Sequence, residues 1–250
     1  MKTVLMALMI WATATCALAT PHYLAPEPTN PSLKVDQIVD HTGYSVGFSR
    51  KYMEPVWVSY QLTAEKANSK ASKRHGNFKV DPDIQGGTAT TADYTRSTYS
   101  RGHQAPAADM HWSEDAMKEC FYYSNMCPQK QTFNAGVWED LETQVRQFAV
   151  DLDVIYVVTG PVLRPGLKTI GPDKVAVPTK FYKVVLYVSD SDTMAIGFIV
   201  PTAATSRDLT RYAVPVDSVE AVTGLDFFND LPDGTENRVE SDVETDFWMR

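Results

Sequence analysis

The sequence predicts a single domain of the α+β class, because strand patterns and a helix pattern share 250 residues with no internal repeat and no domain boundary. Hydrophobic residues make up 44% of the chain and charged residues 22%, as in an ordinary globular protein. Short runs rich in β-branched and aromatic residues indicate strands. These runs span residues 44–49, 56–62, 154–160, 181–188 and 195–201.

The elements follow in chain order. Of the first two strand runs, the second alternates apolar and polar residues, and a polar, glycine-containing stretch at residues 66–98 indicates a surface loop. Residues 115–125, "DAMKECFYYSN", could begin as a helical turn and continue as a strand. The clearest helix lies at residues 132–150, where apolar residues recur at spacings of 3, 4 and 3 and form one stripe. The stripe consists of Trp138, Leu141, Val145 and Phe148.

The three later strand runs fit strands that are buried against helices. After them, residues 216–228 indicate a short helix with its packing turn, and a polar end follows. The net charge is −8, and residues 217–250 alone carry ten acids and two arginines. The acidity is therefore local to the tail, and a site for a polyanion elsewhere in the chain is not excluded. Lys66, Lys70, Lys73 and Arg74 form one basic cluster.

The first 19 residues have the pattern of a signal peptide: a basic start, a short apolar run and a small-x-small cleavage site at residues 17–19. A lipoprotein signal at Cys16 is a less favoured alternative. The run is too short for a stable membrane anchor. We therefore expect a secreted or periplasmic protein, with an extended leader at residues 20–40 and a domain at residues 41–250 that includes the acidic tail.

Two cysteines, Cys120 and Cys127, remain after the leader. An exported protein could join them in a disulfide, but the chain between them would have to turn sharply to bring the two α-carbons close enough. The sequence leaves this pairing open. A zinc site has little support, because no paired histidine motif accompanies the cysteines.

The strongest candidate for chemistry is Arg101-Gly102-His103, followed by Asn134 and Glu142, because the nucleophile and nucleotide-loop motifs are absent. A neutral histidine can act as a base near neutral pH, an arginine can bind a phosphate with two hydrogen bonds, and an asparagine oxygen suits Mg²⁺. Each residue also has a plain structural interpretation. His103 could be a buried structural histidine, Asn134 a helix N-cap, Glu142 a solvated helix residue and Arg101 a surface charge.

Three segments resolve this ambiguity by resemblance: "RGHQAPAAD" at 101–109, "SNMCPQ" at 124–129 and "FNAGVWEDLE" at 133–142. In this order and spacing they resemble the DNA/RNA non-specific endonucleases, the ββα-metal or His-Me finger nucleases that include endonuclease G. Further segments of the chain match the same pattern, from about His41 to Phe228. The resemblance implies a central antiparallel sheet flanked by helices, with a hairpin-plus-helix finger at residues 99–148.

By the same resemblance, His103 is the general base. Asn134 is the single direct ligand of Mg²⁺, with Mn²⁺ or another divalent ion as alternatives. Glu142 is the acid that fixes the water around the ion.

The remaining roles carried over by resemblance concern the substrate. Arg101 is expected to contact the phosphate, Asn125 to lie in the active site, and Gln129 to occupy a neighbouring substrate-binding position. Arg74 matches an arginine that stabilises the transition state.

The implied function is Mg²⁺-dependent hydrolysis of DNA and RNA to 5′-phosphorylated products. Little sequence preference is expected, because contacts to phosphates carry no base information. Two alternatives remain: an exported nucleic-acid-binding protein on the same fold that has lost catalysis, and a phosphodiesterase that acts on small nucleotides.

The chain departs from the family pattern at Ser100, where the family commonly has an aspartate. We expect that residue to organise the turn by accepting backbone N–H groups, which a serine hydroxyl can also do. Ser100→Asp should therefore preserve or only modestly alter nuclease activity, measured on purified protein. A loss of more than about tenfold in a folded variant would show that the turn is tuned to serine.

Overall fold

The computed structural model describes residues 27–29 and 35–249. The predicted signal peptide and most of the predicted leader lie outside the described residues. Among the described residues, no helix is long and apolar enough to cross a membrane.

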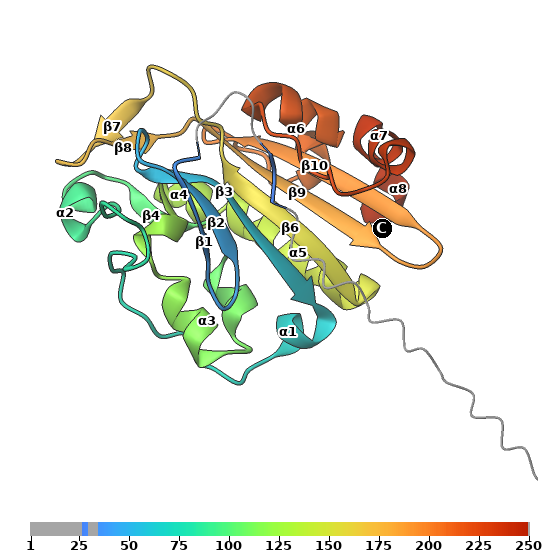
Figure 1. The fold of residues 1–250 in the computed structure, drawn as a ribbon, viewed down its shortest axis with the longest axis horizontal. Helices are drawn as coiled ribbons and strands as arrows, with labels where there is room; N and C mark the ends of the chain where they lie inside the picture. Colours follow the sequence, from blue (N-terminus) through green and yellow to red (C-terminus); the bar gives the residue numbers. More distant parts are fainter. Residues whose placement is uncertain (1–26, 30–34, 250) are drawn as a thin grey trace, which may run out of the picture.

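A seven-stranded antiparallel sheet forms the centre of the domain (Figure 1). All five predicted strand runs are confirmed as members of this sheet. The strands run in the order β1-β2-β3-β6-β9-β10-β11. Their bounds are Gln37–Asp40, Ser45–Ser49, Glu54–Thr63, Val154–Pro161, Lys180–Val188, Thr193–Pro201 and Ala213–Val214.

Both faces of the sheet are covered, which explains why its central strands are apolar almost without interruption. One core cluster joins the sheet to α5 (Val137–Leu152), whose predicted stripe is buried. A second cluster joins the opposite face to α6 (Val216–Thr223). Neighbouring residues of β3 therefore enter different cores, Trp57 the second and Val58 the first. The α+β class predicted from the sequence is confirmed.

A separate two-stranded hairpin, β4 with β5, lies beside the sheet. Strand β4 (Ser100–His103) pairs antiparallel with β5 (Met126–Gln129). Two 3₁₀ turns and α3 lie between the strands. Their bounds are Ala107–Met110 for η1, Glu114–Glu119 for α3 and Tyr123–Asn125 for η2.

The strand expected up to residue 125 is wrong, because the chain turns through η2 and β5 begins only at Met126. Phe121 and Tyr123 are buried in core clusters instead of alternating across a ladder. The turn brings Cys120 and Cys127 into the interior, where both are free thiols. No disulfide joins them.

The helix predicted at residues 132–150 is divided in two. The short α4 (Gln131–Asn134) ends before α5 begins at Val137. Between them Gly136 adopts φ −124° and ψ −122°, and a β-carbon there would lie 2.3 Å from the carbonyl oxygen of Thr132. Only glycine fits this break without a shift of the backbone. Asn134 therefore ends α4 and does not cap α5, so its N-cap interpretation is wrong.

The acidic tail contains more structure than the expected polar end. The predicted helix at 216–228 is confirmed as α6, and two further helices follow it, α7 (Asp233–Ser241) and α8 (Thr245–Trp248). Trp248 is buried, with its ring 4.9 Å from that of Phe148 in α5.

Four short elements complete the fold. The expected loop at residues 66–98 contains the end of α1 and all of α2. A small hairpin of β7 and β8 stands at one end of the molecule (Figure 1). The bounds are Ala64–Asn68 for α1, Thr91–Tyr94 for α2, Lys168–Ile170 for β7 and Val175–Val177 for β8. A further 3₁₀ turn, η3, spans Leu209–Tyr212.

Candidate active site

The end of β4, the start of η1, helix α4 and one face of α5 surround a solvent-accessible pocket of about 270 Å³. We call it the His103 pocket. Four of the residues expected to act in chemistry line it: Arg74, His103, Asn134 and Glu142. They come from the loop before β4, from β4, from α4 and from α5, so the fold gathers residues up to 68 positions apart.

His103 is only 9% exposed, and its ring lies edge-on to Phe121 at 4.9 Å. The buried Nε2 has no hydrogen-bond partner among the described residues. Burial, and second the positive charge of Arg74, lower the pKa of His103 from 6.5 to about 3. The imidazole is therefore neutral at physiological pH, which is the protonation state that a general base requires.

Asn134 is held at the end of α4 by the break at Gly136. Its side chain makes no hydrogen bond with another described residue, although it lines the pocket opposite two carboxylates. Its amide oxygen is a hard, neutral donor, and Glu142 and Glu139 add hard carboxylate oxygens. This donor set fits Mg²⁺ or Mn²⁺ better than a soft metal ion.

Glu142 lies two turns along α5, next to a group of buried charges. Burial raises its pKa to about 8, although the nearby positive charges of Lys183 and Arg146 oppose that shift. Lys183 is fully buried, donates to Thr159 Oγ1 at 3.1 Å and lies 4.9 Å from the centre of the Trp138 ring. The ionised form of Glu142 therefore depends on cations close to it.

Arg146 also lines the His103 pocket, although no motif in the sequence pointed to it. It lies four residues after Glu142, one turn further along the same face of α5. Its Nη1 donates to Asp109 Oδ1 at 3.0 Å, and Tyr60 donates to the other oxygen of that carboxylate at 2.9 Å. The helical spacing from Glu142 was the signal that could have identified it.

Arg101 does not line the pocket. Its Nε donates to the hydroxyl of Tyr123 at 2.9 Å, and its guanidinium lies 5.0 Å from the ring centre of Phe78 and 5.2 Å from that of Tyr94. This aromatic cage fixes the side chain of Arg101, which belongs to β4. Phe78 also contacts the His103 ring, at 5.8 Å, so one phenylalanine separates the two side chains.

Asn125 and Gln129 are both fully buried and lie outside the pocket lining. The Asn125 amide accepts from the backbone N–H of Ala105 at 2.8 Å and donates to the carbonyls of Ala105 and Cys120. It braces the turn that follows His103. Neither polar atom of the Gln129 amide has a partner among the described residues.

Ser100 stands at the start of β4 and donates its hydroxyl to Gln131 Oε1 in α4. The hydroxyl thus donates to a side chain, whereas the sequence predicts that it accepts from backbone N–H groups. The observed bond instead joins the start of the hairpin to the helix that carries Asn134.

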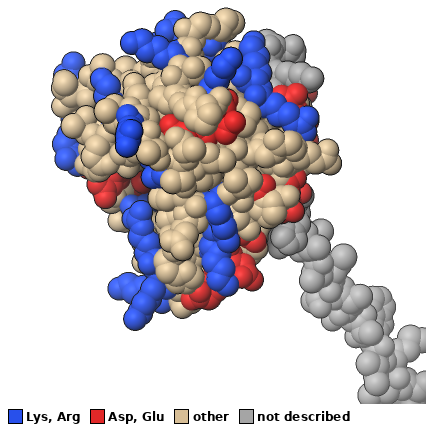
Figure 2. All heavy atoms as spheres, turned by 90° about the vertical axis from the view of Figure 1, so that its left-hand side faces the viewer, with Lys and Arg blue, Asp and Glu red and all other residues tan. Residues whose placement is uncertain are grey.

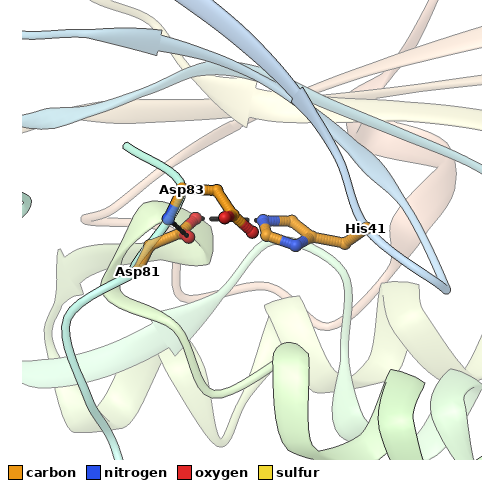
Figure 3. Close-up of side chains that lie close together, drawn as sticks. All are labelled: His41, Asp81 and Asp83. Carbon is orange, nitrogen blue, oxygen red and sulfur yellow. Dashed lines mark hydrogen bonds and ion pairs between the residues drawn. The ribbon is translucent and has the colours of Figure 1, made fainter. Parts of the chain in front are cut away.

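A second group of potential metal ligands lies apart from the pocket, at His41, Asp81 and Asp83 (Figure 3). Their ligand atoms lie within 4.8 Å of one another. However, the Asp81 carboxylate already binds His41 Nε2 at 2.9 Å, the Ser124 hydroxyl at 2.5 Å and the backbone N–H of Asp83 at 3.0 Å. Burial would raise the pKa of Asp81, but these hydrogen bonds outweigh burial and lower it. These hydrogen bonds occupy the Asp81 carboxylate, so we interpret the group as stabilising the fold and call it the structural clasp.

Comparison with known proteins gives a consistent result. Residues 26–234 match the family described as DNA/RNA non-specific endonuclease. Mitochondrial nuclease EXOG of Danio rerio is 38% identical over 204 residues, which cover 75% of this chain and 60% of that relative. Mitochondrial nuclease 1 of Schizosaccharomyces pombe is 34% identical, over 85% of this chain and 72% of that relative. Nuclease C1 of Cunninghamella echinulata is 36% identical, over 77% of this chain and 83% of that relative.

The fold is also found in a solved structure. A chain in the crystal structure of the EndoG/EndoGI complex matches with a TM-score of 0.75 and 33% sequence identity, over 81% of this chain and 89% of that chain. This chain spans 60% of the length of the Danio rerio relative.

The names of the relatives contradict the secreted or periplasmic localisation expected from the leader, because those from Danio rerio, Schizosaccharomyces pombe and Saccharomyces cerevisiae are mitochondrial nucleases. An apolar leader with one basic residue is typical of an export signal, but the prediction of export is wrong. Its composition alone did not identify the compartment.

The environment of His103 predicts its titration. In metal-free protein the imidazole should stay neutral from pH 8 down to pH 5, because its pKa is lowered to about 3. Arg74→Gln removes the second cause of the shift and should raise that pKa. Imidazole NMR signals recorded against pH measure both effects, and titration of His103 near pH 6.5 in the unaltered protein would contradict them.

The lowered pKa of His103 also makes the free energy of unfolding depend on pH. Between pH 6.5 and 3 the unfolded chain binds a proton at His103 that the folded chain does not bind. This group therefore lowers the free energy of unfolding as the pH falls through that interval.

Proposed function

The chain belongs to the DNA/RNA non-specific endonuclease family, and on that premise we propose that it hydrolyses phosphodiester bonds of DNA and RNA. The proposed cofactor is Mg²⁺, with Mn²⁺ able to replace it, and His103 is the general base.

One observation carries the proposal. A neutral histidine, an asparagine oxygen that binds no described residue, and a carboxylate line a single accessible pocket together with two arginines. Burying the His103 imidazole with an unpartnered nitrogen would be costly for structure alone. Together they supply a base, hard oxygen donors and cations, which phosphodiester hydrolysis requires.

The oxygen of Asn134 would hold the divalent ion, and Glu142 would hold the water around it. When bound, such an ion neutralises charge on the phosphate oxygens and on the leaving oxygen. Lys183 and Arg146 favour the ionised form of Glu142.

His103 accepts a proton from a water molecule at an imidazole nitrogen. The water oxygen forms a bond to phosphorus while the bond from phosphorus to the 3′ oxygen breaks. Arg74 and Arg146 place positive charge beside the phosphate, where negative charge builds up. The leaving 3′ oxygen takes up a proton, and the other fragment keeps a 5′ phosphate.

The two alternatives have less support. A binding protein that has lost catalysis would not need His103, Asn134 and Glu142 to converge on one pocket. A phosphodiesterase for small nucleotides would need a closed site, whereas this pocket opens to solvent and adjoins further hollows. For the compartment, the names of the relatives favour mitochondria over export.

A plasmid assay tests the proposal. The protein is incubated with supercoiled plasmid, single-stranded DNA or RNA, in Mg²⁺ or EDTA, beside His103→Ala and Asn134→Ala. We expect Mg²⁺-dependent cleavage that leaves 5′ phosphates, and His103→Ala should lose about 10²–10⁴-fold in rate because it removes the base.

Asn237→Ala, at an exposed position in α7, is the matched control for the asparagine variant and should retain activity. Circular dichroism establishes that each variant folds. Tight nucleic-acid binding without cleavage in any divalent ion would contradict the proposal and favour the binding protein.

A further inference from the structure

A basic groove of about 350 Å³ lies at the end of the molecule that carries β7 and β8. Lys130, Arg164 and Lys168 line it, and no aspartate or glutamate does. Figure 2 views this end of the molecule and shows Lys and Arg side chains around the margin of the face, with smaller acidic patches between them. The local charge of the groove is positive although the chain as a whole is acidic.

The three cations are available to a ligand. All three residues are exposed, and none forms an ion pair with a carboxylate in the described part of the chain. Arg207, nearby, differs because it is paired with Asp140. Unpaired cations that converge on a hollow without acids favour a ligand with several negative charges.

The basic groove is linked to the His103 pocket through shared lining residues. A connecting hollow lies between them and is lined mainly by small and polar residues. It shares Ala135 with the His103 pocket, and it shares Lys130 and Thr202 with the basic groove. A chain-like ligand can therefore lie along all three hollows.

The β4–β5 hairpin links the two ends of this path. His103 lies at one end of β4, and Ser100 pairs with Gln129 at the other, about 10 Å away along the strand. Tyr99, before Ser100, and Lys130, after Gln129, both line the basic groove. Lys130 also begins α4, which carries Asn134 four residues later. The groove is therefore fixed in position relative to the site of cleavage.

We propose that the basic groove binds phosphates of the substrate strand beyond the bond that is cleaved, through Lys130, Arg164 and Lys168. This proposal rests on the proposed function and specifies its substrate: a polynucleotide long enough to lie along the three hollows. The contacts are to phosphates, so they add affinity and positioning without base sequence preference.

Binding measurements test the groove separately from catalysis. The protein carries His103→Ala, and its affinity for a labelled 12-nucleotide single strand is measured against salt concentration in EDTA. Arg164→Gln and Lys168→Gln, each added to this background, should weaken binding about 3–5-fold at low salt. Each should also reduce the slope of log affinity against log salt by about 0.7, the value for one lost phosphate contact on a single strand.

Arg238→Gln is the matched control, because Arg238 is exposed on α7 and lines a different pocket that shares no residue with the three hollows. It should leave both the affinity and the salt slope within twofold of the background protein. Equal losses in all three variants would overturn the proposal, because they would show a general effect of charge.

Cleavage by the otherwise unaltered protein distinguishes the two proposals. The ratio of kcat/KM for the 12-nucleotide strand to that for a dinucleotide should fall at least fivefold when Arg164→Gln and Lys168→Gln are combined. If both substrates are cleaved and the ratio of their kcat/KM values is unchanged, the groove proposal is overturned and the proposed function stands. Absence of Mg²⁺-dependent cleavage of either substrate would overturn the proposed function, and the groove proposal with it.

Discussion

The antiparallel pairing of β4 with β5 is the constraint on which the candidate site depends, because it fixes His103 and the start of α4 relative to each other. Glycine at position 102 leaves room for the buried Gln129 side chain, because a β-carbon there would lie 2.1 Å from Gln129 Oε1. Asn125 closes the other end of the hairpin by binding backbone groups of Ala105 and Cys120. The glycine in Arg-Gly-His is thus a packing requirement, and the buried amides support the side chains that act.

Burial controls the charges of the site. It keeps His103 neutral, and it raises the pKa of Glu142 to about 8 even though Lys183 and Arg146 lie close by. The proposed roles need a neutral histidine beside an ionised Glu142, so a bound divalent ion would have to supply the remaining positive charge. Helix α5 supplies part of that charge, because Glu142 and Arg146 lie one turn apart on the face that meets the pocket.

Elements with a regular pattern could be predicted from sequence, and contacts between distant segments could not. The stripe on α5 and the five strand runs needed only local periodicity. The break at Gly136 was missed because the apolar spacing begins only after it, and its cause is a contact with a backbone carbonyl. The cage around Arg101 depends on Phe78 and Tyr94, which no local pattern connects to β4. The packing of α8 was not predicted because acids surround it in the sequence, although the Trp248 ring packs on Phe148 and Phe247 packs on Tyr187.

The central claim is that the metal ion belongs in the His103 pocket and that the His41–Asp81–Asp83 group is a structural clasp. Mn²⁺ binding, followed by electron paramagnetic resonance, tests it most directly on the unaltered protein, Asn134→Ala and Asp83→Asn. The account predicts that Asn134→Ala weakens binding of the ion at least about tenfold, as expected for a lost ligand, and that Asp83→Asn binds it as the unaltered protein does. Loss of the ion in Asp83→Asn with full binding in Asn134→Ala would contradict the account.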